Sequence, residues 1–138
     1  AVLKCQKLIK SKYFLMLLPD DLIMEANCSM AMLKLHKKYN SSVIASKKVK
    51  AQDVSRWGIF KLKKFIKNNF LIKDVIEKPQ IKSAPSNYAV IGRYILPKKI
   101  FKILRKQRPK LTYHQANPRI YPIQVVPLLF QLFLSLTF

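Results

Sequence analysis

The stretch YFLMLLPDD at residues 13–21 is a short apolar run that a proline and two aspartates bring to a stop. A continuous apolar run of this length predicts a strand that is buried on both faces, as in parallel sheets. Apolar residues then recur at helical spacing, and Asn27 is available as the cap of the predicted helix. The recurring residues are Cys28, Ala31, Met32, Leu35 and Tyr39. A buried strand followed by a helix predicts an α/β fold.

The rest of the sequence up to residue 104 continues this mixed pattern. Apolar runs or alternation between apolar and polar residues predict further strands, and a period of 3.6 residues predicts helices. The predicted strands are residues 43–45, 57–62, 70–77 and 87–95, and the predicted helices are residues 1–10 and a helix that begins at Pro97. We therefore expect a mixed sheet with flanking helices in one compact domain, for which a length of 138 residues leaves room.

The chain is strongly basic, with 27 Lys and Arg residues against six acids and a net charge of +21. Such a charge attracts polyanions, but the basic residues are scattered along nearly the whole sequence, and no zinc-finger or RNA-recognition motif accompanies them. We interpret them as a solvated, lysine-rich surface whose binding to nucleic acid is only adventitious. A dedicated basic nucleic-acid-binding protein is the alternative, and it would bind polynucleotides tightly with a steep dependence on salt.

Residues 105–138 differ from the sequence before them, since they are first basic and rich in proline and then almost entirely apolar. The apolar residues 125–138 number 14 and include Pro127, whereas a helix needs about 20 residues to cross a bilayer. We therefore expect no membrane span. Our hypothesis is that this tail is divergent and read out of frame. With no signal peptide and no metal-binding spacing around its two cysteines, the chain is predicted to be cytoplasmic.

Three short segments carry side chains suited to chemistry on sugar phosphates. Asp20 follows a predicted strand, at the edge of the sheet where a carboxylate can hold Mg²⁺, although an aspartate pair there also serves as a turn or a helix cap. Glu77 and Lys78 place a hydrogen-bond acceptor and a cation together, which suits a sugar phosphate or an ordinary surface ion pair. Gly58 can bring its backbone close to a ligand, and for Gly92 we favour a β-bulge.

Four motifs resemble the bacterial UTP–glucose-1-phosphate uridylyltransferases. They are LLPDDLI at residues 17–23, RWGI at 56–59, IEKP at 76–79 and APSNYAVIGRYIL at 84–96. They occur in the family's order, and the resemblance covers roughly residues 1–104. It implies an incomplete Rossmann-like nucleotidyltransferase fold, similar to that of the glycosyltransferase-A proteins. It also implies the reaction that joins UTP to glucose 1-phosphate and releases UDP-glucose and pyrophosphate.

The resemblance also implies roles for individual residues. Asp20 matches the family's Mg²⁺-binding aspartate. Gly58 matches the glycine whose backbone contacts glucose, Glu77 the acceptor for sugar hydroxyls, and Lys78 the lysine that contacts the phosphates of the sugar nucleotide. Asn87 and the Gly92-Arg93-Tyr94 run match a segment beside the sugar pocket.

The sequence also departs from the family pattern. The G-x-G-T-R loop that grips the phosphates of UTP does not occur in residues 1–138, and the Q-L-T-D segment expected after residue 104 is not found. Residues 1–104 are therefore interpreted as the central part of a nucleotidyltransferase domain, a fragment that is inactive alone. The alternative is a chain that is active only when complemented by a separate N-terminal fragment. That fragment, or a second copy of the chain in a homo-oligomer, is the expected protein partner.

Overall fold

The computed structural model describes residues 2–21, 23, 27–106 and 133–137. Two α-helices, three short 3₁₀ helices (η) and six strands form within these residues. Their order is η1 (Val2–Lys7), β1 (Tyr13–Leu17), α1 (Cys28–Tyr39), β2 (Ser42–Lys48), η2 (Ala51–Arg56), β3 (Gly58–Ile66), β4 (Asn69–Glu77), η3 (Ile81–Ser83), β5 (Tyr88–Pro97), α2 (Ile100–Lys106) and β6 (Phe133–Thr137).

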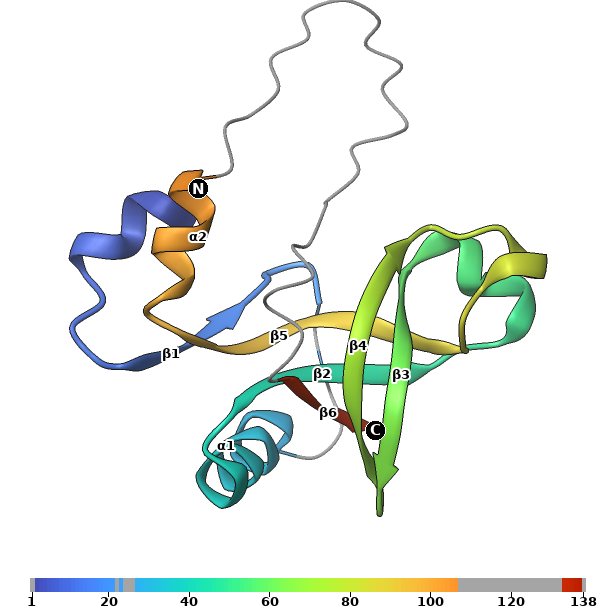
Figure 1. Ribbon diagram of the computed structural model, residues 1–138, viewed down its shortest axis with the longest axis horizontal. Helices are drawn as coiled ribbons and strands as arrows, with labels where there is room; N and C mark the ends of the chain where they lie inside the picture. Colours follow the sequence, from blue (N-terminus) through green and yellow to red (C-terminus); the bar gives the residue numbers. More distant parts are fainter. Residues whose placement is uncertain (1, 22, 24–26, 107–132, 138) are drawn as a thin grey trace, which may run out of the picture.

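The six strands form one sheet in the order β1-β5-β2-β6-β4-β3. All the pairings are antiparallel except that of β2 with β6, so the sheet is mixed and the predicted α/β class is confirmed. The hairpin β3–β4 crosses β2 and β5 at a steep angle (Figure 1). As a result β3 also reaches β5, where Ile59 pairs with Ala89.

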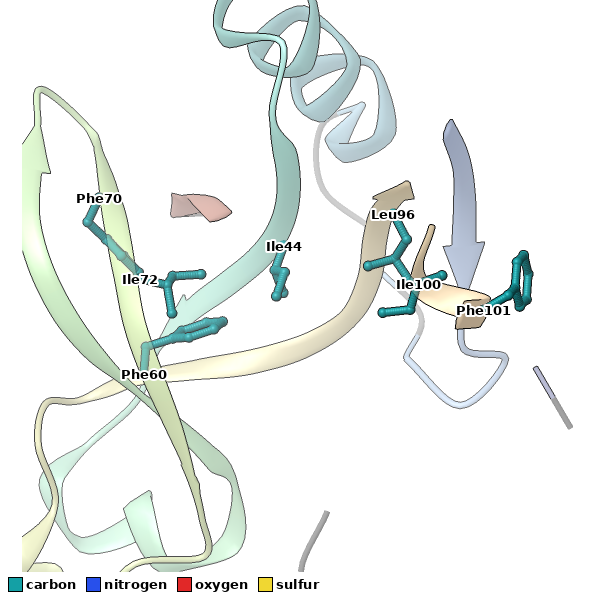
Figure 2. Close-up of a cluster of buried hydrophobic side chains, with 7 residues drawn as sticks. All are labelled: Ile44, Phe60, Phe70, Ile72, Leu96, Ile100 and Phe101. Carbon is teal, nitrogen blue, oxygen red and sulfur yellow. The ribbon is translucent and has the colours of Figure 1, made fainter. Parts of the chain in front are cut away.

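Alternation along β2 and β5 divides the core between the two faces of the sheet. On one face α1 packs over Val43, Ala45 and Ile95. The opposite face carries a second apolar cluster, which is drawn in Figure 2 and which α2 and β1 help to cover. That cluster consists of Ile44, Phe60, Phe70, Ile72, Leu96, Ile100 and Phe101. We call the side of the sheet that bears this cluster the phenylalanine face.

Helix α1 forms where its sequence pattern predicts it. The side chain of Asn27 accepts a hydrogen bond of 3.2 Å from the backbone N–H of Met30, which satisfies a free donor of the first turn. At the other end Asn40 adopts a left-handed conformation with φ of 46°, a common way for a helix to end. Cys28, Met32 and Leu35 form the buried stripe of the helix.

Three predictions about individual elements are wrong. Strand β1 is not buried on both faces, because among the described strands it pairs only with β5, in antiparallel fashion, and Leu15 and Leu17 are 36% and 51% exposed. Within the predicted helix at residues 1–10, Val2–Lys7 form the short 3₁₀ helix η1 instead of an α-helix. Pro97 is the last residue of β5, and α2 begins only at Ile100.

The backbone of β6 lies between β2 and β4. Strand pairing is made by backbone groups, which every sequence carries. The position of β6 therefore does not test the hypothesis that the tail is read out of frame. Most of residues 105–138 lie outside the described residues, and the boundary proposed at residue 104 falls within α2. None of the helices in the described part of the chain is long and apolar enough to span a membrane.

Candidate functional site

The first part of the candidate site lies where β3 begins and β4 ends. Gly58 pairs with Glu77 across these strands, and the backbone N–H of Lys78 donates a hydrogen bond of 2.9 Å to the carbonyl of Trp57. A Cβ atom placed on Gly58 would lie 3.0 Å from Oε2 of Glu77, so the carboxylate rests directly against the glycine. The side chains of Glu77 and Lys78 are exposed. Sheet pairing therefore brings three of the predicted residues together, with the acceptor and the cation open to a ligand.

The second part is the turn that follows β1, which we call the acidic turn (residues 18–21). Oδ2 of Asp21 accepts a hydrogen bond of 2.6 Å from the backbone N–H of Gly92 on β5. The N–H of Leu18 donates to the carbonyl of Gly92 at 2.8 Å, and Nη1 of Arg93 donates to the carbonyl of Leu18 at 3.1 Å. Asp20 is exposed and makes no hydrogen bond or ion pair with the described residues. Asp21 thus fastens the turn while Asp20 stays available.

Gly92 allows this fastening because it lacks a side chain. A Cβ atom at this position would lie 2.5 Å from Oδ2 of Asp21 and 2.6 Å from Cβ of Leu18, which is closer than real atoms approach. The pairing of β2 with β5 also shifts register here, from Ile44 opposite Tyr94 to Ser46 opposite Val90. The register shift spans residues 91–93 of β5, so the β-bulge at Gly92 stays a prediction, and the close approach to the glycine is made by the acidic turn.

Strand β5 connects the two parts of the site. Val90 lies 3.5 Å from the Cβ position of Gly58 and packs, like Tyr94, against the phenylalanine face. Burial raises the pKa of Tyr94 to about 12, and the negative charges of Asp21, Glu77 and Asp20 add to the shift in that order. Carboxylates from both parts of the site therefore act on the same phenol.

Asn87 lies apart from these groups. It precedes β5, and its backbone carbonyl accepts a hydrogen bond of 2.9 Å from the N–H of Val49 after β2. No described contact joins Asn87 to Glu77 or to the acidic turn, so its role in sugar binding stays a prediction. The site residue that sequence reasoning missed is Asp21, which lies beside the predicted Asp20 and holds the N–H of Gly92.

The acidic turn offers few ligands for a magnesium ion. No group of three or more His, Cys, Asp or Glu side chains that could hold a metal ion occurs among the described residues. Asp20 offers a free carboxylate, whereas one oxygen of Asp21 is already occupied by Gly92. Because Mg²⁺ is often held by one or two carboxylates together with substrate phosphates and water, a single free aspartate is compatible with it.

Comparison with known proteins agrees with these motifs. The family described as nucleotidyl transferase matches residues 1–122. This chain belongs to the nucleotidyl transferase family. Its relatives include a UTP–glucose-1-phosphate uridylyltransferase from Streptococcus pyogenes, 36% identical over 115 residues, and one from Pseudomonas aeruginosa, 32% identical over 112 residues. Each alignment covers 79% of this chain, and the chain spans 38% and 40% of these two relatives.

Solved structures in the nucleotidyl transferase family share the fold. A UDP-glucose pyrophosphorylase complexed with UDP-glucose is 32% identical and superposes with a TM-score of 0.80 over 99% of this chain and 52% of its own. A UTP-bound UGPase from Acinetobacter baumannii, 23% identical, reaches 0.78 over 99% of this chain and 47% of its own, which supports the fold alone. The resemblance seen in the sequence is confirmed at the level of family and fold.

Proposed function

We propose that this nucleotidyl transferase chain provides the sugar-phosphate side of a UTP–glucose-1-phosphate uridylyltransferase site. The observation that carries the proposal is the pairing of Gly58 with Glu77, with Lys78 next to it at the same strand end. An exposed carboxylate beside an exposed ammonium group suits a ligand that has both hydroxyl groups and phosphate. The relatives named above support this choice of reaction.

Each residue has a defined task in the proposed site. Glu77 accepts hydrogen bonds from glucose hydroxyls, and Gly58 leaves its backbone open to the sugar. Lys78 neutralises phosphate charge. In the reaction, a phosphate oxygen of glucose 1-phosphate attacks the α-phosphorus of UTP in line, and the bond from that phosphorus to pyrophosphate breaks. Catalysis of such a transfer depends mainly on positioning and charge neutralisation, which are the contributions that these residues can make.

Asp20 is the residue proposed to hold Mg²⁺. When bound, the ion would neutralise negative charge that builds up on the phosphates in the transition state. Asp21 contributes by keeping the acidic turn that carries Asp20 against β5. The predicted cytoplasmic location remains part of this proposal.

We further propose that the 138-residue chain binds the sugar phosphate without catalysing the transfer. The G-x-G-T-R pattern that the family uses to grip UTP does not occur in this sequence. A second chain that carries this loop would complete the site. In support of complementation, β1 pairs only with β5 among the described strands, and the exposed Leu15 and Leu17 offer apolar surface at that edge.

Binding and turnover can be tested separately on the purified chain. Trp57 is the only tryptophan and adjoins Gly58, so its fluorescence reports ligand at this end of the site. We expect saturable quenching by UDP-glucose, weakened about tenfold in Glu77→Gln and Lys78→Ala, since each loses a charge-assisted contact. Lys82→Ala, another exposed lysine nearby, should bind like the wild type. Absence of any saturable binding would disprove the sugar-phosphate assignment.

The activity assay follows UDP-glucose formation from UTP and glucose 1-phosphate with Mg²⁺. The chain alone should give none, and a separate polypeptide carrying the G-x-G-T-R segment should restore it. Asp20→Ala should abolish the restored activity. Turnover by the chain alone that is lost in Asp20→Ala would contradict the claim of inactivity, and failure of every such segment would remove the complementation proposal.

A further inference from the structure

Apart from the candidate site, the fold builds a cluster of cations from two distant parts of the chain. Residues 2–12 contain four lysines, and residues 98–106 contain four lysines and one arginine. All nine of these side chains are exposed, and neither range contains an acidic residue. Among the described residues no acid forms an ion pair with them. We call the two ranges together the basic lobe (residues 2–12 and 98–106).

The fold holds the two halves of the basic lobe against each other. Where β1 begins and β5 has ended, the N–H of Lys98 donates a hydrogen bond of 2.8 Å to the carbonyl of Lys12. Nη2 of Arg105 on α2 donates a hydrogen bond of 2.6 Å to Oε1 of Gln6 on η1. Figure 1 shows η1 and α2 together at one end of the sheet, with the hairpin β3–β4 toward the other end. Cations that are far apart in the sequence therefore share one surface.

The basic lobe also exposes two leucines. Leu8 is 77% exposed, more than any other large apolar side chain of the described residues, and Leu3 is 42% exposed. Their neighbours Val2 and Ile9 pack instead against the cluster of the phenylalanine face. Residues three positions apart lie on the same side of a 3₁₀ helix, so Leu3 lies on the side of Gln6, where η1 contacts α2. Both leucines thus reach solvent among the lysines.

Leucines surrounded by lysines suit the surface of a bilayer that contains anionic lipid. The ammonium groups attract acidic headgroups, and the long methylene chains let them stay at the headgroups while neighbouring apolar side chains enter the boundary of the acyl region. A cluster of cations gains affinity with each lysine near such a surface, and the cytoplasmic leaflet is the acidic one. The basic lobe combines both contributions.

A nucleic acid fits the basic lobe less well. Proteins that bind single strands combine cations with aromatic rings on which the bases stack. The aromatic residue within the two ranges of the lobe is Phe101, and it is only 1% exposed. Binding to a duplex depends on phosphate contacts and would leave Leu3 and Leu8 in solvent. The exposed leucines therefore favour a lipid surface over a polynucleotide.

We propose that the basic lobe docks the chain on an anionic lipid surface, with its cations at the headgroups and with Leu3 and Leu8 inserted at the interface. The contact is peripheral, since the lobe lies on the bilayer. This inference goes beyond the proposed sugar-phosphate function and is independent of it, because Gly58, Glu77 and Asp20 lie outside the lobe.

The first test measures co-sedimentation of the full 138-residue chain with vesicles of phosphatidylcholine, alone or mixed with phosphatidylglycerol. We expect binding to the mixed vesicles and none to pure phosphatidylcholine. The double substitution of Lys4→Glu and Lys7→Glu should weaken this binding roughly tenfold or more, because two attractive charges become repulsive. The matched control is Lys61→Glu with Lys64→Glu, which changes two exposed lysines of β3 at the same spacing and alters the net charge equally. It should bind like the wild type.

The second test addresses insertion of the leucines. Leu8→Ser removes no core contact, because the side chain is so exposed, and it should weaken binding to the mixed vesicles roughly five- to tenfold. Ile81→Ser is the matched control, since Ile81 is 54% exposed and lies in another 3₁₀ helix, η3, outside the lobe. It should bind the vesicles like the wild type, and circular dichroism checks that each variant keeps its fold.

Three results would overturn the inference. An equal loss in the two double lysine variants would mean that the net charge attracts lipid without a dedicated surface. Unchanged vesicle binding in Leu8→Ser would exclude insertion. A chain that ignores the vesicles but binds a single-stranded oligothymidylate, and loses that binding with Lys4→Glu and Lys7→Glu, would make the lobe a nucleic-acid surface. Loss of vesicle binding in both lobe variants, with both controls unaffected, would establish the lipid contact.

Discussion

Glu77 and Asp20 occupy two ends of one candidate site, but the chain positions them in different ways. Glu77 lies at the end of a hairpin whose pairing runs from Gly58 opposite Glu77 to Ile66 opposite Asn69, with register shifts between Lys61 and Lys64. Asp20 depends on a turn that is fastened through Asp21 to Gly92, 71 residues away in the sequence. The hairpin spreads its restraint over many backbone bonds, whereas the acidic turn relies on a few contacts. Single substitutions should therefore disturb the acidic turn much more than the hairpin.

Gly92→Ala should give the largest effect on stability. Its Cβ would lie 2.5 Å from Oδ2 of Asp21 and 2.6 Å from Cβ of Leu18, so the turn must move away from β5. We expect a loss of about 3 kcal/mol in the free energy of unfolding, at the upper end for overpacking. Denaturation in urea, followed by circular dichroism, measures it.

Gly58→Ala is the matched control for this prediction. Its Cβ would meet Oε2 of Glu77 at 3.0 Å, and this atom ends a flexible, exposed side chain that can move aside. The cost should stay below about 1 kcal/mol, while UDP-glucose binding weakens because the sugar face is obstructed. Equal losses of stability in the two alanine variants would contradict the contrast between hairpin and turn.

The adjacent aspartates provide the next largest effect. Asp21→Ala removes the acceptor of the Gly92 N–H, and a lost hydrogen bond to a charged group costs about 2 kcal/mol. Asp20→Ala should change the free energy of unfolding by less than about 0.5 kcal/mol, because Asp20 is exposed and makes no described hydrogen bond. The same urea titration compares the two, and a larger loss for Asp20→Ala would mean that the roles are exchanged.

Alkaline pH should weaken the fold through Tyr94. Its pKa is raised from 10.0 to about 12 in the folded chain by burial and by Asp21, Glu77 and Asp20. The unfolded chain therefore loses this proton first as the pH rises, so the stabilisation is complete below pH 10 and is lost between about 10 and 12. The slope is at most about 1.4 kcal/mol per pH unit for one proton.

Tyr94→Phe isolates this contribution, because the other tyrosines and lysines are unchanged. Urea titrations at several pH values from 9 to about 11 should show a shallower loss of stability in the variant than in the wild type. Parallel curves would show that the phenol of Tyr94 ionises as readily in the folded chain as in the unfolded one.

The contrast between hairpin and turn also explains which elements could be predicted from the sequence. Helix α1 carries its own signal in the Asn27 cap and the helical spacing, and strand β4 carries its signal in a run rich in aromatic and β-branched residues that ends before Pro79. The sequence of β1 alone does not determine how far the strand is buried, because the same apolar run suits a central strand and an edge strand. Its burial depends on the number of neighbouring strands, and in the described sheet β1 has one neighbour, β5.

The same limit applies to the site. Glu77 and Lys78 were found because they are adjacent in a motif that ends a recognisable strand. Which of Asp20 and Asp21 is free could not be derived from their position after β1, because it depends on the distant N–H of Gly92. Tyr94 was singled out only as part of the Gly92-Arg93-Tyr94 run, and the effect of Asp21, Glu77 and Asp20 on its pKa depends on the fold.

The smallest predicted effect strengthens the hairpin side of the comparison. Lys67 is the first residue of the two-residue loop between Ile66 and Asn69, and its φ of 55° lies in the left-handed region that costs a side chain energy. Lys67→Gly relieves this cost but adds backbone freedom to the unfolded chain, so we expect a net gain of about 0.5–1 kcal/mol in the free energy of unfolding.

Lys73→Gly, which replaces an exposed lysine within β4, should instead destabilise by a similar amount, because glycine weakens a strand interior. Since Lys67 is remote from the Gly58–Glu77 end of the hairpin, the gain should leave UDP-glucose binding unchanged, and a change in affinity would show that the hairpin transmits strain along its length.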